Sequence, residues 1–325
     1  MKRSINKLFI SATLFFSCTD KIVEQLPITT NSERARKHYQ KAREYYLTTD
    51  FPEGWTSLDS ALAIDPNFAM ASLIRWHPDP SIRAKNRKKA YSLISTVSDA
   101  EKYILNANRC EDEGNLDSAL FYIKELVEKY PNSYESYNEL GVIYGSRNEL
   151  KLAEEAFKES IEIYPDNYMA YTYLFGQHVM YGFYDLLPTE ERDVNIGLKY
   201  AEKLIELKPN SAHGFHAKAN CYRQLGEFEK AIPLYDKSVE LSKGTTAEAS
   251  ENYVSAHNIM FAGDFEKARE RYKQALKVVK DAQTETSIKT FITISYLFQR
   301  NFEGALDNLY SMEESFKNNK TIDSS

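Results

Sequence analysis

An internal repeat is the feature that most limits what this chain can fold into. Pro131 and Pro165 lie 34 residues apart, and each closes a segment with helical periodicity. A period of roughly 20 to 50 residues is typical of solenoids, in which each unit buries its flank against the next. The chain has 12 Gly and 10 Pro against 23 Tyr and 17 Phe, so it lacks the turn-rich composition of β sandwiches. We therefore expect an all-α protein built from repeated helix pairs.

The unit that begins at Tyr134 shows how one helix pair is built. Its pattern residues are Tyr137, Leu140, Gly141 and Tyr144 on a first helix, Ala153 and Phe157 on a second, and Pro165 at the end. Small residues let the two helices approach closely, and large residues fill the remaining space. The pattern resembles the tetratricopeptide repeat (TPR). The resemblance implies a right-handed superhelical solenoid of helix-turn-helix repeats and a non-catalytic scaffold that binds protein segments.

Further units align with this one along most of the chain. We expect repeats near residues 35–68, 69–99, 100–133, 134–167, 168–211, 212–245, 249–282 and 286–319, in a solenoid over 33–319 that is followed by a tail at 320–325. The small residue of the second helix is Gly or Ala in all seven well-defined units: Gly54, Ala119, Ala153, Gly197, Ala231, Ala268 and Ala305. Seven repeats exceed the roughly three that a solenoid needs for stability, so we expect a stable monomer.

Two units depart from the pattern. Unit 69–99 is degenerate, because the sequence His77-Pro78-Asp79-Pro80 should end its first helix at Trp76. The unit at 168–211 carries an insertion of about ten residues around 182–193, and insertions in repeats often fall on the binding face. This insertion is either a lengthened helix with a loop or a contact for a partner.

The N-terminus has the pattern of an export signal. Residues 1–17 combine basic residues with a short apolar run, about half of the roughly 20 residues that span a bilayer, and we expect a signal peptide. The segment that ends at Cys18 resembles the lipobox of bacterial lipoproteins, which implies a lipid on Cys18. Residues 18–32 then form a linker, and the protein is anchored in the bacterial cell envelope, with the outer membrane as the expected site. Alternatively, Cys18 is an unmodified residue of a soluble exported protein.

Charge and motif content argue against several function classes. The 41 Lys and Arg against 47 Asp and Glu give a formal charge of -6, so we expect no nucleic-acid partner. The chain has no CxxC, HExxH, P-loop, GxSxG or GxGxxG motif, so we expect no enzyme and no cofactor. Cys110 and Cys221 fall on first helices about three repeats apart, too far for a disulfide that requires Cα atoms within about 7 Å.

Candidate binding residues follow from the family resemblance. In tetratricopeptide repeats the second, fifth, ninth and twelfth residues of the first helix line the concave groove. The candidates from three units are Arg36, Tyr39, Arg43, His213, His216, Asn220, Arg223, Tyr253 and His257. In the middle of the chain, the same face is acidic through Glu101, Glu111 and Glu135, with Asn108 beside them. A carboxylate clamp is not expected, because the basic fifth-position residue is missing or is only a histidine.

Three functions remain open. The resemblance favours an adaptor that binds other envelope proteins or peptide segments. A carbohydrate-capture lipoprotein is the second possibility, since starch-binding lipoproteins of gut bacteria also contain such helices, although those chains are longer and carry larger insertions. A metal-dependent hydrolase on His213, His216 and His257 is the third, but we expect no metal.

Overall fold

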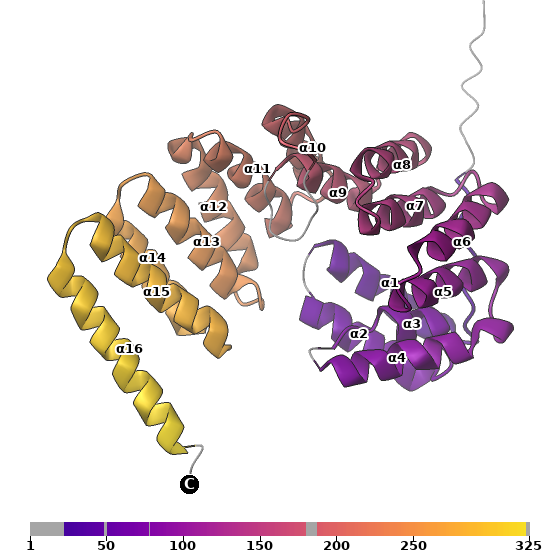
Figure 1. Cartoon of the computed structure of the whole chain (residues 1–325), viewed down its shortest axis with the longest axis horizontal. Helices are drawn as coiled ribbons and strands as arrows, with labels where there is room; N and C mark the ends of the chain where they lie inside the picture. Colours follow the sequence, from indigo (N-terminus) through magenta and orange to yellow (C-terminus); the bar gives the residue numbers. More distant parts are fainter. Residues whose placement is uncertain (1–22, 49–50, 78, 180–186, 323–325) are drawn as a thin grey trace, which may run out of the picture.

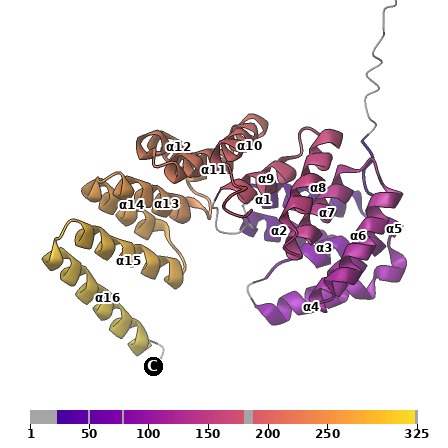
Figure 2. The same cartoon turned by 45° about the horizontal axis from the view of Figure 1, so that its top comes forward.

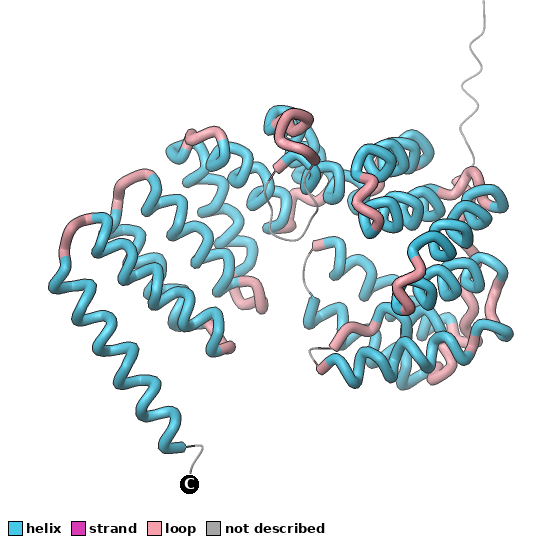
Figure 3. Tube along the Cα trace, in the orientation of Figure 1, coloured by secondary structure: helices cyan, strands magenta, loops and turns pink. Residues whose placement is uncertain are grey.

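The protein is a curved array of helix pairs. The computed structural model describes residues 23–48, 51–77, 79–179 and 187–322, and this part of the chain contains helices and no strand (Figures 1 and 3). The all-α solenoid predicted from the repeat is confirmed. No helix within these ranges is both long and apolar enough to cross a bilayer. The predicted signal peptide and Cys18 lie outside the described residues.

The helices follow one another in the order of the repeats. In chain order they are α1 (Glu33–Leu47), α2 (Phe51–Ile64), α3 (Ala69–Ile74), α4 (Pro80–Ser92), the short η1 (Ile94–Thr96), α5 (Asp99–Asp112), α6 (Leu116–Lys129), α7 (Tyr134–Ser146), α8 (Leu150–Ile163), α9 (Tyr168–His178), α10 (Val194–Leu207), α11 (Ala212–Gln224), α12 (Phe228–Ser242), α13 (Glu248–Phe261), α14 (Phe265–Val278), α15 (Ala282–Phe298) and α16 (Phe302–Ile322). Each odd-numbered helix packs against the even-numbered helix that follows it, and each pair packs against the next.

The small residues of the second helices lie where the helices approach most closely. All seven of these glycines and alanines are buried. A Cβ atom at Gly54 would lie 2.4 Å from the Cε1 of Tyr46, and one at Gly197 would lie 2.3 Å from the Cγ2 of Val179. Even an alanine would therefore force the facing side chain to move, which explains the absence of a larger residue at these positions.

The N-terminal half of the solenoid curls back on itself. The first helix, α1, contacts α9, although about four helix pairs of chain separate the two (Figure 2). Leu47 at the end of α1 packs into a cluster that contains Tyr168 and Phe175 of α9. Arg43 of α1 forms an ion pair of 2.7 Å with Glu135 of α7. Helices α10–α16 continue away from this compact half as an arm that ends at α16 (Figure 1).

The segment before α1 is packed against the solenoid. Residues 23–31 have no regular secondary structure, and the side chain of Leu26 is only 8% exposed. The backbone N–H of Leu26 donates to Glu135 Oε2 at 3.2 Å, and that of Thr29 donates to Glu101 Oε2 at 2.9 Å. The structure therefore differs from the expected linker over 18–32, because the described part of that linker lies on the protein body.

The two irregular units show where the regular packing is interrupted. In the degenerate unit, α3 ends at Ile74 and α4 begins at Pro80, with Asp79 as its N-cap. In the unit with the insertion, α9 ends at His178 and α10 begins at Val194. Leu187 is buried, and its backbone N–H donates to the carbonyl of Gln177. Residues 180–186 lie outside the described residues, so both interpretations of the insertion stay open.

Candidate binding groove

A cavity of about 1080 Å³ lies between the first helices of the N-terminal repeats. We call it the N-terminal cavity. Its walls come from residues 26–28 and from α1, α2, α3, α5, α7 and α9, which the curl of this half brings together. Ligand pockets commonly measure roughly 300 to 1,000 Å³, so this cavity can hold a small molecule or several residues of a peptide.

Aromatic side chains form much of the wall. They are Tyr39, Tyr46, Phe51, Trp55, Trp76, Tyr134, Tyr164, Tyr168 and Tyr173. Burial raises the pKa of Tyr39 to about 12, so its hydroxyl stays protonated at neutral pH and can donate a hydrogen bond. Such a wall offers apolar area together with hydroxyl groups, which suits segments that are partly apolar and partly polar.

The cavity carries more acidic than basic side chains. Its carboxyl groups belong to Glu44, Glu101, Glu135, Glu139 and Asp166, and its cationic groups belong to Arg43 and Lys208. Arg43 is already paired with Glu135. The Lys208 ammonium lies over the ring of Tyr168, 5.1 Å from its centroid. The acidic groups therefore exceed the basic groups by three before any ligand binds.

Glu139 and Glu101 stand out among these carboxyl groups. Burial raises the pKa of Glu139 to about 7; Arg43 opposes this rise, and the charges of Glu135 and Glu111 add to it. Glu101 is only 1% exposed, and its Oε2 accepts hydrogen bonds from Thr29 and Ser98. Its Oε1 is buried and has no hydrogen-bond partner among the described residues. Both residues therefore keep acceptor capacity that the described fold does not use.

The candidates from the first and middle units divide between the cavity and its surroundings. Tyr39 and Arg43 line it, as do the acidic-face residues Glu101, Asn108 and Glu135. Arg36 instead donates to the carbonyl of Ile28 at 3.0 Å and so holds the N-terminal segment.

Sequence reasoning missed Glu139, which follows the fifth residue of its unit, Asn138. The groove rule would have included Glu139 only if it had also counted the residue after the fifth position of the first helix.

The candidates on α11 lie between helices. His213 Nδ1 is 2.8 Å from the Tyr168 hydroxyl, and His216 Nδ1 is 2.7 Å from Glu251 Oε2. Asn220 Oδ1 accepts a hydrogen bond from the Tyr235 hydroxyl at 2.7 Å. As whole residues, His213, His216 and Asn220 are 2%, 9% and 3% exposed. The structure therefore places them in the packing between repeats, where they leave little surface for a partner.

The remaining candidates lie close by and are partly exposed. Arg223 is half-buried and lies over the Tyr235 ring, and Tyr253 is also half-buried. The His257 ring is enclosed by Tyr253 and Phe291, with centroid distances of 4.3 and 4.0 Å. Burial lowers the pKa of His257 to about 4, so it is neutral at pH 7.

The three histidines do not form a metal site. Burial lowers the pKa of His213 to about 4, so its ring, like that of His257, is neutral at pH 7, the form in which an imidazole can bind a metal. Within the described ranges, no group of three or more His, Cys, Asp or Glu side chains could hold a metal ion. His213 and His216 are instead engaged with Tyr168 and Glu251.

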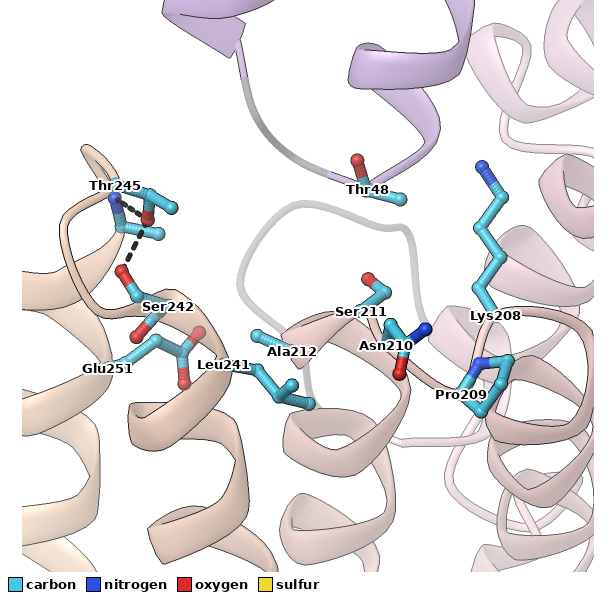
Figure 4. A pocket seen from close by; sticks show the side chains of 11 residues that line it. Thr48, Lys208, Pro209, Asn210, Ser211, Ala212, Leu241, Ser242, Thr245 and Glu251 are labelled. Atoms are coloured by element: carbon cyan, nitrogen blue, oxygen red, sulfur yellow. Dashed lines mark hydrogen bonds between the residues drawn. The ribbon is translucent and has the colours of Figure 1, made fainter.

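A smaller cavity of about 380 Å³ adjoins the end of α1. Figure 4 shows Thr48 facing the loop of Asn210 and Ser211, with Glu251 to one side and Lys208 to the other. The Glu251 carboxylate already accepts hydrogen bonds from His216 and Ser238. Burial raises the pKa of Glu251, but the His216 charge and these two hydrogen bonds lower it more, so its pKa lies below the ordinary value. Lys208 lines both cavities, so the smaller one is a neighbour of the N-terminal cavity.

Comparison with known proteins identifies the repeat. Residues 134–167 and residues 210–281 match models described as tetratricopeptide repeat. The chain contains tetratricopeptide repeats. Mitochondrial import receptor subunit TOM70 of Mus musculus is 21% identical over 137 residues, which are 42% of this chain and 21% of that protein. The Homo sapiens protein of the same name is 21% identical over 132 residues. The chain thus spans about a fifth of the length of the curated relatives it matches.

One solved structure supports the tetratricopeptide fold, and a second aligns over part of the chain. The APC/C hetero-tetramer Cut9-Hcn1 aligns with a TM-score of 0.54 and 13% identity, over 83% of this chain and 51% of that one. MamA from Desulfovibrio magneticus RS-1 aligns with a TM-score of 0.46 and 18% identity, over 56% of this chain and 95% of that one. At these identities, the Cut9-Hcn1 alignment supports the fold alone.

Proposed function

We propose that this protein is a non-catalytic scaffold that binds segments of other proteins in its N-terminal cavity. The observation that carries the proposal is the way residues 23–31 lie on the same surface. This extended segment is held through its backbone, because Glu135 and Glu101 accept N–H groups from Leu26 and Thr29, three residues apart. Every peptide offers such N–H groups, so the surface is suited to an extended chain, and the cavity beside the segment has room for a second one.

The chemistry of the cavity favours binding over catalysis. Its described lining contains no histidine, cysteine or serine, the residues that most often act as general base or nucleophile. The buried thiol of Cys221 lies elsewhere, and burial raises its pKa to about 12. The lining is instead rich in Tyr and Trp rings and contains Arg43, and Trp, Tyr and Arg are the residues that carry most binding energy at protein interfaces.

We further propose that the scaffold works in a bacterial cell envelope, anchored through a lipid on Cys18. The sequence of residues 1–18 supports this location. Because Leu26 and its neighbours are docked, only the short stretch from Cys18 to Val23 can separate the lipid from the protein body. A fully extended chain of that length spans roughly 18 Å. The N-terminal repeats would therefore lie close to the membrane and receive segments of other envelope proteins.

Site-specific photo-cross-linking tests the binding function. A photoreactive residue is placed at Met169, which lines the cavity, and in a matched control at Leu152, which is exposed on α8. We expect defined protein adducts in native cells from position 169 and none of the same mass from position 152. Adducts of the same proteins from both positions, or none from 169, would show that the cavity is not the binding surface.

The location has a separate test. Replacing Cys18 with Ala should release the protein from the membrane fraction, without changing the binding of segments in solution. A Cys18→Ala protein that stays in the membrane fraction would refute the lipid anchor and leave the binding function untouched.

A further inference from the structure

The acidic side of the N-terminal cavity holds a carboxyl group, that of Glu139, with no ion-pair partner of its own among the described residues. Among the described residues, no hydrogen bond or ion pair reaches the Glu139 carboxylate. Arg43, a nearby cation, is 2.7 Å from Glu135 and is paired with it. The buried Oε1 of Glu101 on the same wall also lacks a hydrogen-bond partner among these residues. Partial burial of a carboxylate without an ion-pair partner is costly, and because Glu139 is partly buried, a ligand cation would reduce that cost.

The aromatic wall is already used by cations of the chain itself. The Lys208 ammonium lies over Tyr168, and the Arg43 guanidinium lies 5.9 Å from the Tyr39 ring centroid. Both rings line the cavity. A cation over an aromatic face gains roughly 0.5 to 2 kcal/mol, depending on how far it is removed from water. The wall therefore suits a long side chain that has an apolar stem and a cationic head.

We propose that the N-terminal cavity selects protein segments that carry a lysine or arginine side chain, with the cationic head bound by Glu139 and the stem against the aromatic wall. This inference rests on the proposed binding function and specifies its ligand. Three observations favour such an occupant: the excess of carboxyl groups in the cavity, the absence of an ion-pair partner for Glu139 among the described residues, and the cation contacts on the same rings.

Binding of a cation at Glu139 predicts a dependence on pH. The groups that face Glu139 are Arg43 and Tyr39 from α1, Glu135 from α7 itself and Glu111 from α5. With a pKa of about 7 in the free protein, Glu139 is mostly protonated at pH 6 and mostly ionised at pH 8. A lysine ligand stays charged across this range. If only the ionised form binds, linkage gives an affinity about tenfold weaker at pH 6 than at pH 8.

Peptide retention tests the inference. The probes are two libraries of acetylated, amidated hexapeptides that differ at one fixed position, which is lysine in the first library and uncharged norleucine in the second. Immobilised full-length protein is compared with Glu139→Gln, which keeps the shape and removes the charge. The matched control is Glu159→Gln, an exposed position on α8 with the same change of net charge. Mass spectrometry quantifies the retained peptides at pH 6 and pH 8.

We expect the protein and the Glu159→Gln control to retain the lysine library at least tenfold above the norleucine library at pH 8. Glu139→Gln should remove this preference and its dependence on pH. Equal retention of the two libraries, or an unchanged preference in Glu139→Gln, overturns the inference while the binding function stands. If the protein retains neither library, the proposed function itself fails.

Discussion

Glu139 gives the sharpest test of the electrostatics of the cavity. Its pKa of about 7 in the folded protein lies above the ordinary value of 4.5 expected for the unfolded chain. The folded state therefore binds this proton more tightly than the unfolded state does. The contribution of the protonated Glu139 carboxyl group to stability is fully present below pH 4.5 and is lost as the pH rises through 7.

The size of the effect follows from these two pKa values. Each pKa unit of difference corresponds to about 1.4 kcal/mol, so ionisation of Glu139 should lower the free energy of unfolding by roughly 2 to 3 kcal/mol between pH 5 and pH 8. Glutamine resembles the protonated acid in shape and charge. The variant Glu139→Gln should therefore gain stability relative to the parent protein by this amount as the pH is raised.

Chemical denaturation followed by circular dichroism measures the difference at the two pH values. The free energy of unfolding is measured for Glu139→Gln and for the parent protein at pH 5 and at pH 8. The difference between the two proteins at pH 5 is then compared with their difference at pH 8. Glu159→Gln, on the exposed face of α8, should show almost no such change. A difference that is the same at both pH values would refute the reasoning, because it would mean that the Glu139 carboxylate is solvated or paired.

Three further predictions concern other parts of the fold. The enclosed and neutral ring of His257 should cost the protein about 2 kcal/mol of stability as the pH falls from 7.5 to 5, because the ring is protonated more readily in the unfolded chain. His257→Phe should reduce the measured loss by that amount, and an unchanged loss would show that the ring becomes charged without penalty. Leu26→Ala should lower the free energy of unfolding, measured in urea, by about 2 kcal/mol, and Val23→Ala, at a 37% exposed position, should lower it by much less. Equal effects of the two substitutions would argue against a docked segment. The Cys221 thiol, with a pKa of about 12 and no exposure, should react with a disulfide reagent at pH 8 only after unfolding, and rapid labelling of the folded protein would contradict its burial.

The helix pairs could be predicted from the sequence because their cause is local. A residue such as Ala153 or Gly197 must be small wherever two helices of one repeat touch, and its spacing is visible without any structure. The rule that the second, fifth, ninth and twelfth residues of a first helix line the groove selected Tyr39 and Arg43, and both line the cavity. These predictions depend only on contacts within a repeat or between one repeat and the next.

The cavity itself could not be predicted, because it depends on how the curvature of several repeats adds up. The ion pair between Arg43 and Glu135 joins residues that are 92 positions apart, and no sequence pattern predicts it. Residues 23–31 are held largely through backbone N–H and carbonyl groups, which leave no side-chain periodicity to detect. On α11, polar residues at groove positions found partners on neighbouring helices, as His213 did with Tyr168, and so became buried.

Hydrogen–deuterium exchange with a retained lysine peptide tests the central claim, that the N-terminal cavity is the binding surface. The account predicts that the peptide slows exchange in α1, α5 and α7, whose side chains surround Glu139, and leaves α11 and α13 unchanged. Protection confined to α11 and α13 would contradict the account and place the partner on the face of His216 and Tyr253 instead.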